Sequence, residues 1–589
     1  MRKIAFLLAI VMLLSVALVS CGDDTTPDTP DTPSNDTQKE NPDKDKEENK
    51  EEEYVPMGYR YEKYAEEDRK IINKDTLDLY AATNFKHLNT ENIKGIVIAF
   101  PEINDESMTD TSTIGINLAT FGVAYARVLT DRWGWGDAGV VRLADLVVDA
   151  IKDKYSLGDT TPIVSMGKGM GATSALLYTA DSRHNITACA AEFPVADIER
   201  SFAREKSYTR TFVTSVYAYD SSLKDALQEI SLSAKAKYMP NIPYYIVGGT
   251  DDLIVEATTL KKLVNELGKK SKDITLTMID GAEHGATSAA ESGKIEMFVQ
   301  KQATAKVEAP EKKEYADKNV TAVVPEGTNA GAAYEKYAEA DAEYINFENL
   351  SYYTRNNLRY VEGDIKGIVM EFPGLGGSSC LGGLVGMGEY SSDFAQECGK
   401  KGIAVMYMYC GPWSWGNKGV IRMADLVIDA LKDHYNLPDD IPVVSTGGSM
   451  GGLGALMFTH GSRHNIISCM AACPCYDILG EYRSFEVQKE FPRTYLSAIA
   501  AYDMPLTEGL KAITPQENIA TMPKVPYYVV CNVEDECFDD EGMAVFVQKM
   551  KDAGHDVTFK VLPGTTHGTF TDEERVSYRN FIINSIIGE

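Results

Sequence analysis

The sequence predicts an α/β protein with two tandem domains, each a mostly parallel sheet with helices on both faces. Two observations predict this fold: β-prone runs alternate with helix-period stretches, and long segments of the first half recur in the second. Several β-prone runs are continuously apolar, which is typical of strands buried on both faces. Strands that alternate with helices form parallel sheets. At 589 residues, the chain is long enough for two such domains.

The internal repeats indicate that the two domains are copies of one unit. Tyr61–Glu66 recurs as Tyr334–Glu339, and Ser182–Ile186 recurs as Ser462–Ile466. A unit of about 250 residues is too long for a solenoid repeat, so the copies are tandem domains. Two further pairs are Trp133–Gly136 with Trp413–Gly416 and Arg142–Val147 with Arg422–Val427.

In the second copy, the alternation can be followed element by element. Helix-period stretches such as Gly419–Tyr435 and Glu541–Ala553 separate the strands, and Tyr476–Thr521, which lacks a clear strand, is expected to form a helical insertion. The predicted strands are Gly367–Phe372, Ile403–Tyr409, Val443–Thr446, Ile466–Ala472, Tyr527–Cys531 and Thr558–Leu562.

Composition places the domain boundaries. Residues 1–20 are predicted to be a signal peptide and residues 21–56 a disordered acidic tether. The first domain is placed at 57–302 and the second at 333–589. The linker, residues 303–332, is rich in charged and small side chains.

The N-terminus carries an export pattern. Arg2 and Lys3 precede a short apolar run, Ile4–Ala17, and Leu18-Val19-Ser20-Cys21 follows. This resembles the lipobox of bacterial lipoproteins, which implies lipidation of Cys21 and attachment to the cell membrane outside the cytoplasm. A plain signal peptide or a membrane anchor is the alternative, although the apolar run is short for a span.

Charge narrows the range of partners. The net charge is −29 and no basic patch stands out, which argues against nucleic acid. Residues 23–53 hold 13 acidic residues and 4 lysines, a net charge of −9, so this segment is expected to repel itself and stay unfolded. The oligomeric state stays open.

The ten cysteines allow several interpretations. Export permits disulfides, and Cys531 and Cys537 flank a loop and could pair. Cys473-Pro474-Cys475 is a weak metal signal without matching ligands nearby in the sequence. Buried free thiols are the alternative.

The strongest motif is Gly447-Gly448-Ser449-Met450-Gly451, which matches the G-x-S-x-G pattern of a nucleophile elbow. It follows a β-prone run, Pro442–Thr446, and precedes a helix-like run, Leu453–His460. A strand-to-helix turn this tight needs small residues two places before and after the nucleophile, and glycine stands at both. Ser449 is therefore the expected nucleophile.

With this elbow, the second copy resembles the α/β-hydrolase family, and the resemblance covers nearly all of both copies. The family order of nucleophile, acid and histidine assigns Ser449, then Asp535 after one strand and His567 after the next. The imidazole removes the serine proton, and the carboxylate holds the imidazole in the right tautomer. The resemblance implies two tandem α/β-hydrolase domains and no metal or organic cofactor.

Two neighbouring carboxylates, Glu534 and Glu536, are alternatives to Asp535. The first copy favours Asp535, because Asp252 aligns with it. The spacing from acid to histidine is then 32 residues in both copies, 252 to 284 and 535 to 567.

The family also implies donors for the oxyanion of the tetrahedral intermediate. One is the backbone N–H of Met450. The second is expected in the glycine-rich loop Pro373-Gly374-Leu375-Gly376-Gly377, with the N–H of Leu375 as the donor. The His-Gly opening that is usual in the family is absent from this loop.

The first copy is expected to be inactive. Gly169 stands at the serine position of Met166–Gly171, and the loop Pro101–Glu106 carries carboxylates in place of glycines. Asp252 and His284 persist without a nucleophile to activate. We therefore expect the first copy to have a noncatalytic role in packing, substrate docking or partner binding.

Other residues in both copies are less diagnostic. His464 has a counterpart, His184, in the copy without a nucleophile, so a structural role is expected. Trp413 and Trp415 lie past a strand end, where they could stack on a sugar or an aromatic acyl group. Because the first copy has them too, core packing is favoured.

The sequence as a whole predicts an exported, lipid-anchored serine hydrolase whose second domain alone is active. We expect hydrolysis of a small-molecule or polymer-linked carboxylic ester through an acyl-enzyme on Ser449. A serine peptidase of the same fold, or a noncatalytic surface binding protein, is the alternative.

Overall fold

The computed structural model describes residues 54–105, 112–204, 208–310, 324–325, 327, 329–375, 389–480 and 491–588. The predicted signal peptide, Cys21 and most of the acidic tether lie outside this range, as do Gly376 and Gly377. Residues 54–589 cluster as one compact unit. No helix in the described ranges is long and apolar enough to cross a membrane.

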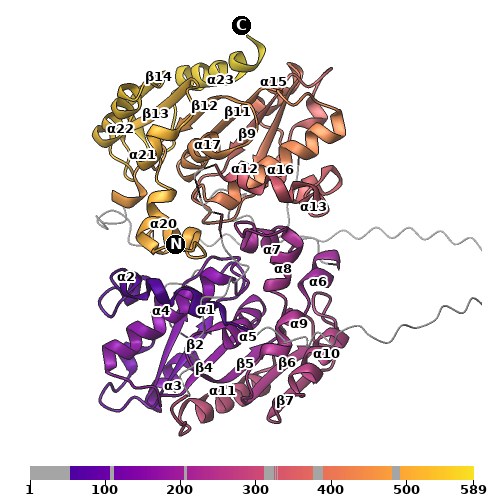
Figure 1. Cartoon of the computed structure of the whole chain (residues 1–589), viewed down its shortest axis with the longest axis vertical. Helices are drawn as coiled ribbons and strands as arrows, with labels where there is room; N and C mark the ends of the chain where they lie inside the picture. Colours follow the sequence, from indigo (N-terminus) through magenta and orange to yellow (C-terminus); the bar gives the residue numbers. More distant parts are fainter. Residues whose placement is uncertain are drawn as a thin grey trace, which may run out of the picture. The chain divides into compact units, whose positions relative to one another are not determined.

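Each copy folds around a seven-stranded sheet, and both sheets have the same topology (Figure 1). All neighbouring strands are parallel except the short edge strand of each sheet, which is antiparallel. The prediction of two tandem α/β-hydrolase-like domains is confirmed. We call the copy from Met57 to Ala303 the Gly169 domain and the copy from Ala330 to Ile587 the Ser449 domain.

The strands of the Gly169 domain follow the order β1-β3-β2-β4-β5-β6-β7. The burial pattern of β2 shows why these runs form central strands, since all six of its residues are buried, as in a sheet covered on both faces. The strands are β1 (Ala81–Thr83), β2 (Gly95–Phe100), β3 (Val123–Val128), β4 (Ile163–Lys168), β5 (Ile186–Glu192), β6 (Tyr244–Gly249) and β7 (Ile274–Ile279).

The Ser449 domain repeats this order as β8-β10-β9-β11-β12-β13-β14. Six of its seven strands lie where the sequence predicts them, and the last two run on by three and four residues toward the predicted site; the short edge strand β8 was not predicted. They are β8 (Thr354–Asn356), β9 (Gly367–Phe372), β10 (Ile403–Met408), β11 (Val443–Gly448), β12 (Ile466–Ala472), β13 (Tyr527–Glu534) and β14 (Val557–Thr566).

Helices flank both sheets (Figure 1). Two long helices, α4 (Ala138–Tyr155) and α16 (Lys418–Tyr435), are mostly buried, and each begins at a capping side chain, Asp137 or Asn417. Other flanking helices are α3 (Thr113–Thr120), α5 (Met170–Asp181), α10 (Ala257–Leu267), α11 (Ala289–Ala303), α15 (Asp393–Lys400), α17 (Met450–Gly461), α22 (Asp540–Asp552) and α23 (Asp572–Ile587).

A helical insertion follows β5 in the Gly169 domain and β12 in the Ser449 domain, as the sequence predicts for the second copy. In the described residues it consists of short helices in both. These are α6 (Ile198–Arg204), α7 (Thr209–Val216), α8 (Leu223–Glu229) and α9 (Leu232–Lys235), then α19 (Phe491–Ile499), α20 (Leu506–Ala512) and α21 (Pro515–Asn518).

Candidate active site

The elbow between β11 and α17 has the strained geometry that the motif predicts. Ser449 caps α17 with φ 58° and ψ −125°, a conformation that non-glycine residues rarely adopt. Both flanking glycines are required sterically. An ideal Cβ on Gly447 would lie 2.3 Å from the Gly451 carbonyl oxygen, and one on Gly451 would lie 2.1 Å from the Phe372 carbonyl oxygen. The backbone N–H of Ser449 donates to Ala472 O at 2.8 Å, which fixes the turn against β12.

The predicted acid and base are joined directly. Nδ1 of His567 lies 2.8 Å from Oδ2 and 2.9 Å from Oδ1 of Asp535. Asp535 follows the end of β13 and His567 follows the end of β14. Of the two alternative acids, Glu534 faces solvent, and the carboxylate of Glu536 accepts the backbone N–H of His567, at 3.4 Å, and not its ring.

Asp535 is held as a carboxylate. Burial by itself would raise the pKa of its carboxyl group, but hydrogen bonds from His567 and from the backbone N–H groups of Cys537 and Phe538 outweigh this effect. The pKa of Asp535 therefore lies below its usual value. An ionised carboxylate on Nδ1 leaves Nε2 of His567 as the nitrogen that can accept a proton from serine.

The Ser449 hydroxyl makes no hydrogen bond within the described residues, so its pairing with His567 stays a prediction. The Gly169 domain supports it. There, an ideal Cβ on Gly169 would lie 3.5 Å from Nε2 of His284, and His284 is held by Asp252 at 2.8 Å. Catalytic hydrogen bonds are often longer without a substrate.

The predicted oxyanion donors flank the nucleophile. Met450 is the first residue of α17, and Gly374 follows β9 with its ideal Cβ 3.7 Å from Cβ of Ser449. Leu375 comes next and is the last described residue of this loop. Both N–H groups thus belong to segments that adjoin Ser449, which supports the proposal that they bind the oxyanion.

Cys473 was not predicted from the sequence to lie beside the acid and the histidine. Its Sγ, a carboxylate oxygen of Asp535 and a ring nitrogen of His567 lie within 4.8 Å of one another. The thiol bonds to Asn532 Oδ1, and burial raises its pKa to about 12. Two possible metal-ligating residues therefore lie near Cys473. They follow β13 and β14, far along the chain, so they are not visible next to Cys473-Pro474-Cys475 in the sequence. A positive φ of 43° directly after β12 marks the position.

The eight described cysteines are all free, including the pair at 531 and 537 that could have formed a disulfide.

Trp413 and Trp415 are buried, which confirms packing rather than stacking on a substrate. The ring nitrogen Nε2 of His464 bonds to the Asp425 carbonyl at 3.1 Å, and the same bond recurs between His184 and Asp145. These histidines are structural.

The site of the Gly169 domain keeps the elbow and the acid–histidine pair but not the glycine-rich oxyanion loop. Gly169 has φ 56°, close to that of Ser449. Glu102, at the position of Gly374, lies 3.4 Å from Nζ of Lys168. Asp105 is paired with Arg127 at 2.5 Å, so this carboxylate, expected to face an oxyanion, is engaged elsewhere. Glu106 lies outside the described residues.

The comparisons with known proteins agree with this geometry. The sequence model described as the prolyl oligopeptidase family matches residues 124–303 and again 414–583, one match in each domain and together more than half of the chain. No curated protein sequence is similar enough to count as a match.

Solved structures that are similar to parts of this chain include an acylaminoacyl peptidase from Pyrococcus horikoshii (15% identity, TM-score 0.31) and an esterase from Pyrococcus furiosus (14% identity, TM-score 0.27). The alignment with the peptidase covers 38% of this chain and 37% of the peptidase, so the chain spans little more than a third of its length. For the esterase, the shares are 36% and 81%.

Proposed function

Since this chain belongs to the prolyl oligopeptidase family, within the α/β-hydrolase superfamily, and is by that membership a serine hydrolase, we propose that its Ser449 domain hydrolyses carboxylic esters through an acyl-enzyme. The observation that carries the proposal is the Asp535–His567 pair, 2.8 Å apart, at strand ends beside a strained serine elbow. A hydroxyl in this setting attacks a carbonyl once imidazole removes its proton.

In the proposed mechanism, His567 takes the Ser449 proton as Oγ attacks the carbonyl carbon. The N–H groups of Met450 and Leu375 stabilise the oxyanion. The imidazolium then returns the proton to the leaving alcohol, and the same histidine activates water to release the acid. Asp535 stays ionised throughout, because its hydrogen bonds hold its pKa low.

A peptide bond is the second candidate, because the matching family model is that of a peptidase family. The two reactions share every residue named above and differ in the leaving group. For an amide, protonation of the nitrogen by His567 is essential because an amine anion is a poor leaving group. For an ester, protonation of the leaving oxygen matters less, because an alkoxide is a better leaving group than an amine anion.

One experiment tests the class and a second separates the bonds. A fluorophosphonate should label wild-type protein on Ser449 and should not label Ser449→Ala. Unlabelled wild type would favour a surface binding protein. Matched p-nitrophenyl esters and p-nitroanilides with the same acyl groups then compare the bonds, and we expect higher kcat/KM for the esters. Faster anilide cleavage would assign a peptidase.

We further propose that the protein is a lipoprotein outside the cytoplasm, anchored through Cys21. The lipobox-like Leu18-Val19-Ser20-Cys21 and the acidic segment after it support this. Such an anchor would hold the enzyme at the membrane, with access to esters of small molecules or polymers.

A further inference from the structure

The two domains are joined by reciprocal buried contacts. The Arg142 guanidinium lies 2.6 Å from Asp68 in the Gly169 domain and donates to three carbonyls of the Ser449 domain. Arg422 lies 2.5 Å from Asp341 and does the same in return. All four side chains are 1% exposed. The acceptors are Ala500, Tyr502 and Met504 for Arg142, and Tyr217, Tyr219 and Ser221 for Arg422.

Tyrosines repeat the same reciprocity. The Tyr61 hydroxyl donates to Ala501 O at 3.0 Å, and the Tyr334 hydroxyl donates to Ala218 O at 2.6 Å. Each ring also lies under the arginine of its own domain. Contacts in which residue i meets j and j meets i define a two-fold, isologous interface, so the two domains pack as the halves of a homodimer would.

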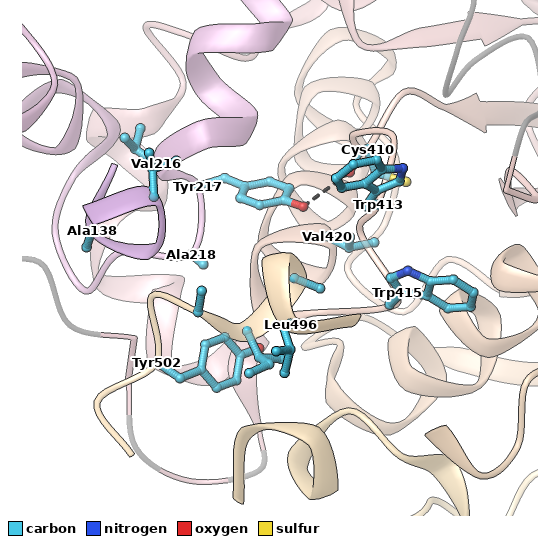
Figure 2. Packing of buried hydrophobic residues seen from close by; sticks show 14 of the residues in the cluster. Ala138, Val216, Tyr217, Ala218, Cys410, Trp413, Trp415, Val420, Leu496 and Tyr502 are labelled. Atoms are coloured by element: carbon cyan, nitrogen blue, oxygen red, sulfur yellow. Dashed lines mark hydrogen bonds between the residues drawn. The ribbon is translucent and has the colours of Figure 1, made fainter. Parts of the chain in front are cut away.

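Tyr217 is one of the positions where the reciprocity fails. Tyr217, which follows α7, corresponds in the other copy to Ala500, which has no ring. Figure 2 shows the Tyr217 side chain extended to the Ser449 domain, where its hydroxyl donates to Cys410 O at 3.1 Å. The ring fits only because position 419 is glycine. An ideal Cβ on Gly419 would lie 2.2 Å from the Tyr217 ring. Tyr217 is 6% exposed.

Other side chains of α7 contact the same loop. The Arg210 guanidinium lies over the ring of Tyr409 at 4.6 Å, and an ideal Cβ on Gly411 would meet Thr214 at 3.8 Å. The Gly169 domain therefore packs against the segment from Tyr409 to Trp413, which follows β10 at the carboxyl end of the catalytic sheet.

This segment adjoins the predicted oxyanion loop. Strand β10 pairs with β9, whose end leads into Pro373–Leu375 beside Ser449. In the Gly169 domain, the equivalent loops are bonded together, because Trp133 Nε1 donates to Asn104 Oδ1 at 2.9 Å. Trp413 occupies the position of Trp133, but glycine stands at the position of Asn104 and has no side chain to accept this bond. In the Ser449 domain, Leu375 packs instead against the buried apolar cluster that contains Trp413. The loop after β10 can therefore support the oxyanion loop through this apolar packing.

We propose that Tyr217 of the Gly169 domain is a positioning residue for the Ser449 site. Its hydroxyl and ring hold the Tyr409–Trp413 segment, and this segment holds the oxyanion loop. The inference rests on the proposed function and assigns a role to the Gly169 domain. The domain supports the oxyanion loop of the Ser449 site and does not contact the substrate.

The test compares Tyr217→Phe and Tyr217→Ala with Tyr61→Phe in the full chain. Tyr61→Phe is the matched control, because it also removes one hydrogen bond from a phenol to a carbonyl across the same interface. Measured quantities are kcat and KM for a p-nitrophenyl ester, the rate of Ser449 labelling by a fluorophosphonate, and the thermal midpoint.

We expect Tyr217→Phe to lower kcat and the labelling rate about 3- to 10-fold, the effect of one net hydrogen bond, with KM within about twofold of wild type. Tyr217→Ala should lower them further. Tyr61→Phe should shift the thermal midpoint as much as Tyr217→Phe and leave kcat unchanged.

Wild-type kcat in both Tyr217 variants would overturn the inference, as would an equal loss of kcat in Tyr61→Phe. If Tyr217→Ala does not fold, Gly419→Ala displaces the ring from the other side, and Gly139→Ala is its counterpart, with 3.0 Å to Ala500 Cβ. Ester turnover that survives Ser449→Ala would instead refute the proposed function, independently of Tyr217.

Discussion

Restoring a serine at Gly169 tests whether the nucleophile is all that the first domain has lost. A serine fits there. Among the described residues, its Cβ would meet only Nε2 of His284, at an ordinary contact distance of 3.5 Å, and the backbone already has φ 56°. The left-handed conformation costs a serine about 1–2 kcal/mol. The Asp252–His284 pair is intact at 2.8 Å, so the proton could be removed.

A restored serine would still lack stabilisation of the oxyanion. Glu102 stands where Gly374 lies against the nucleophile in the Ser449 domain. A carboxylate about 4 Å from a developing oxyanion opposes it by roughly 4 kcal/mol at an effective dielectric constant of 20, although Lys168 offsets part of this. A displaced loop donor would cost about 3–4 kcal/mol more. Together these effects predict roughly 10⁵-fold lower kcat than wild type.

The variant Gly169→Ser, made in a Ser449→Ala background, should therefore show no measurable hydrolysis of p-nitrophenyl esters. Adding Glu102→Gly should raise the rate of fluorophosphonate labelling at the restored hydroxyl by up to about 10³, because it removes the charge. Turnover of the single restoration variant within tenfold of wild type would refute the reasoning, since the oxyanion site would then be intact.

Three further predictions concern the base, the anchor and pH. His567→Ala should be nearly inactive in ester hydrolysis and His284→Ala nearly normal; the reverse result would exchange the roles of the domains. Cys21→Ser should abolish incorporation of labelled fatty acid and move the protein to the soluble fraction, and unchanged labelling would count against the lipobox. Burial raises the pKa of Glu371, next to the oxyanion loop on β9, from 4.5 to about 7. Its contribution to stability is therefore complete below pH 4.5 and is lost as pH rises through 7, by about 3 kcal/mol. Glu371→Gln should remove this fall in urea unfolding measured from pH 5 to 8, and an unchanged pH profile would refute the assignment.

The central strands and the elbow could be predicted because their signals are local. An apolar run such as Gly367–Phe372 identifies a strand buried on both faces, and the glycines around Ser449 are needed by the turn itself. The edge strand Thr354–Asn356 was not predicted, since three polar residues paired to a neighbour on one side carry no periodic signal. Cys473 was missed as a neighbour of His567, because β12, β13 and β14 bring the two together only in the folded sheet.

The interface explains what the Gly169 domain has kept. Its catalytic parts have diverged, at Gly169 and Glu102, whereas Arg142 and Asp68 match their counterparts in the Ser449 domain in identity, burial and bonding. Removing one member of a buried ion pair costs about 3–5 kcal/mol, a large share of the roughly 5–15 kcal/mol that stabilises a typical domain. A nucleophile can be lost without that cost, since Gly169 keeps the same backbone conformation. The Ser449 domain therefore depends on its neighbour as a folded surface, which can be tested by Arg142→Met. This variant leaves Asp68 and three carbonyls without their donor and should lower the thermal midpoint by about as much as Arg422→Met. A much larger fall for one of the two would show that the two-fold contacts are not energetically equivalent.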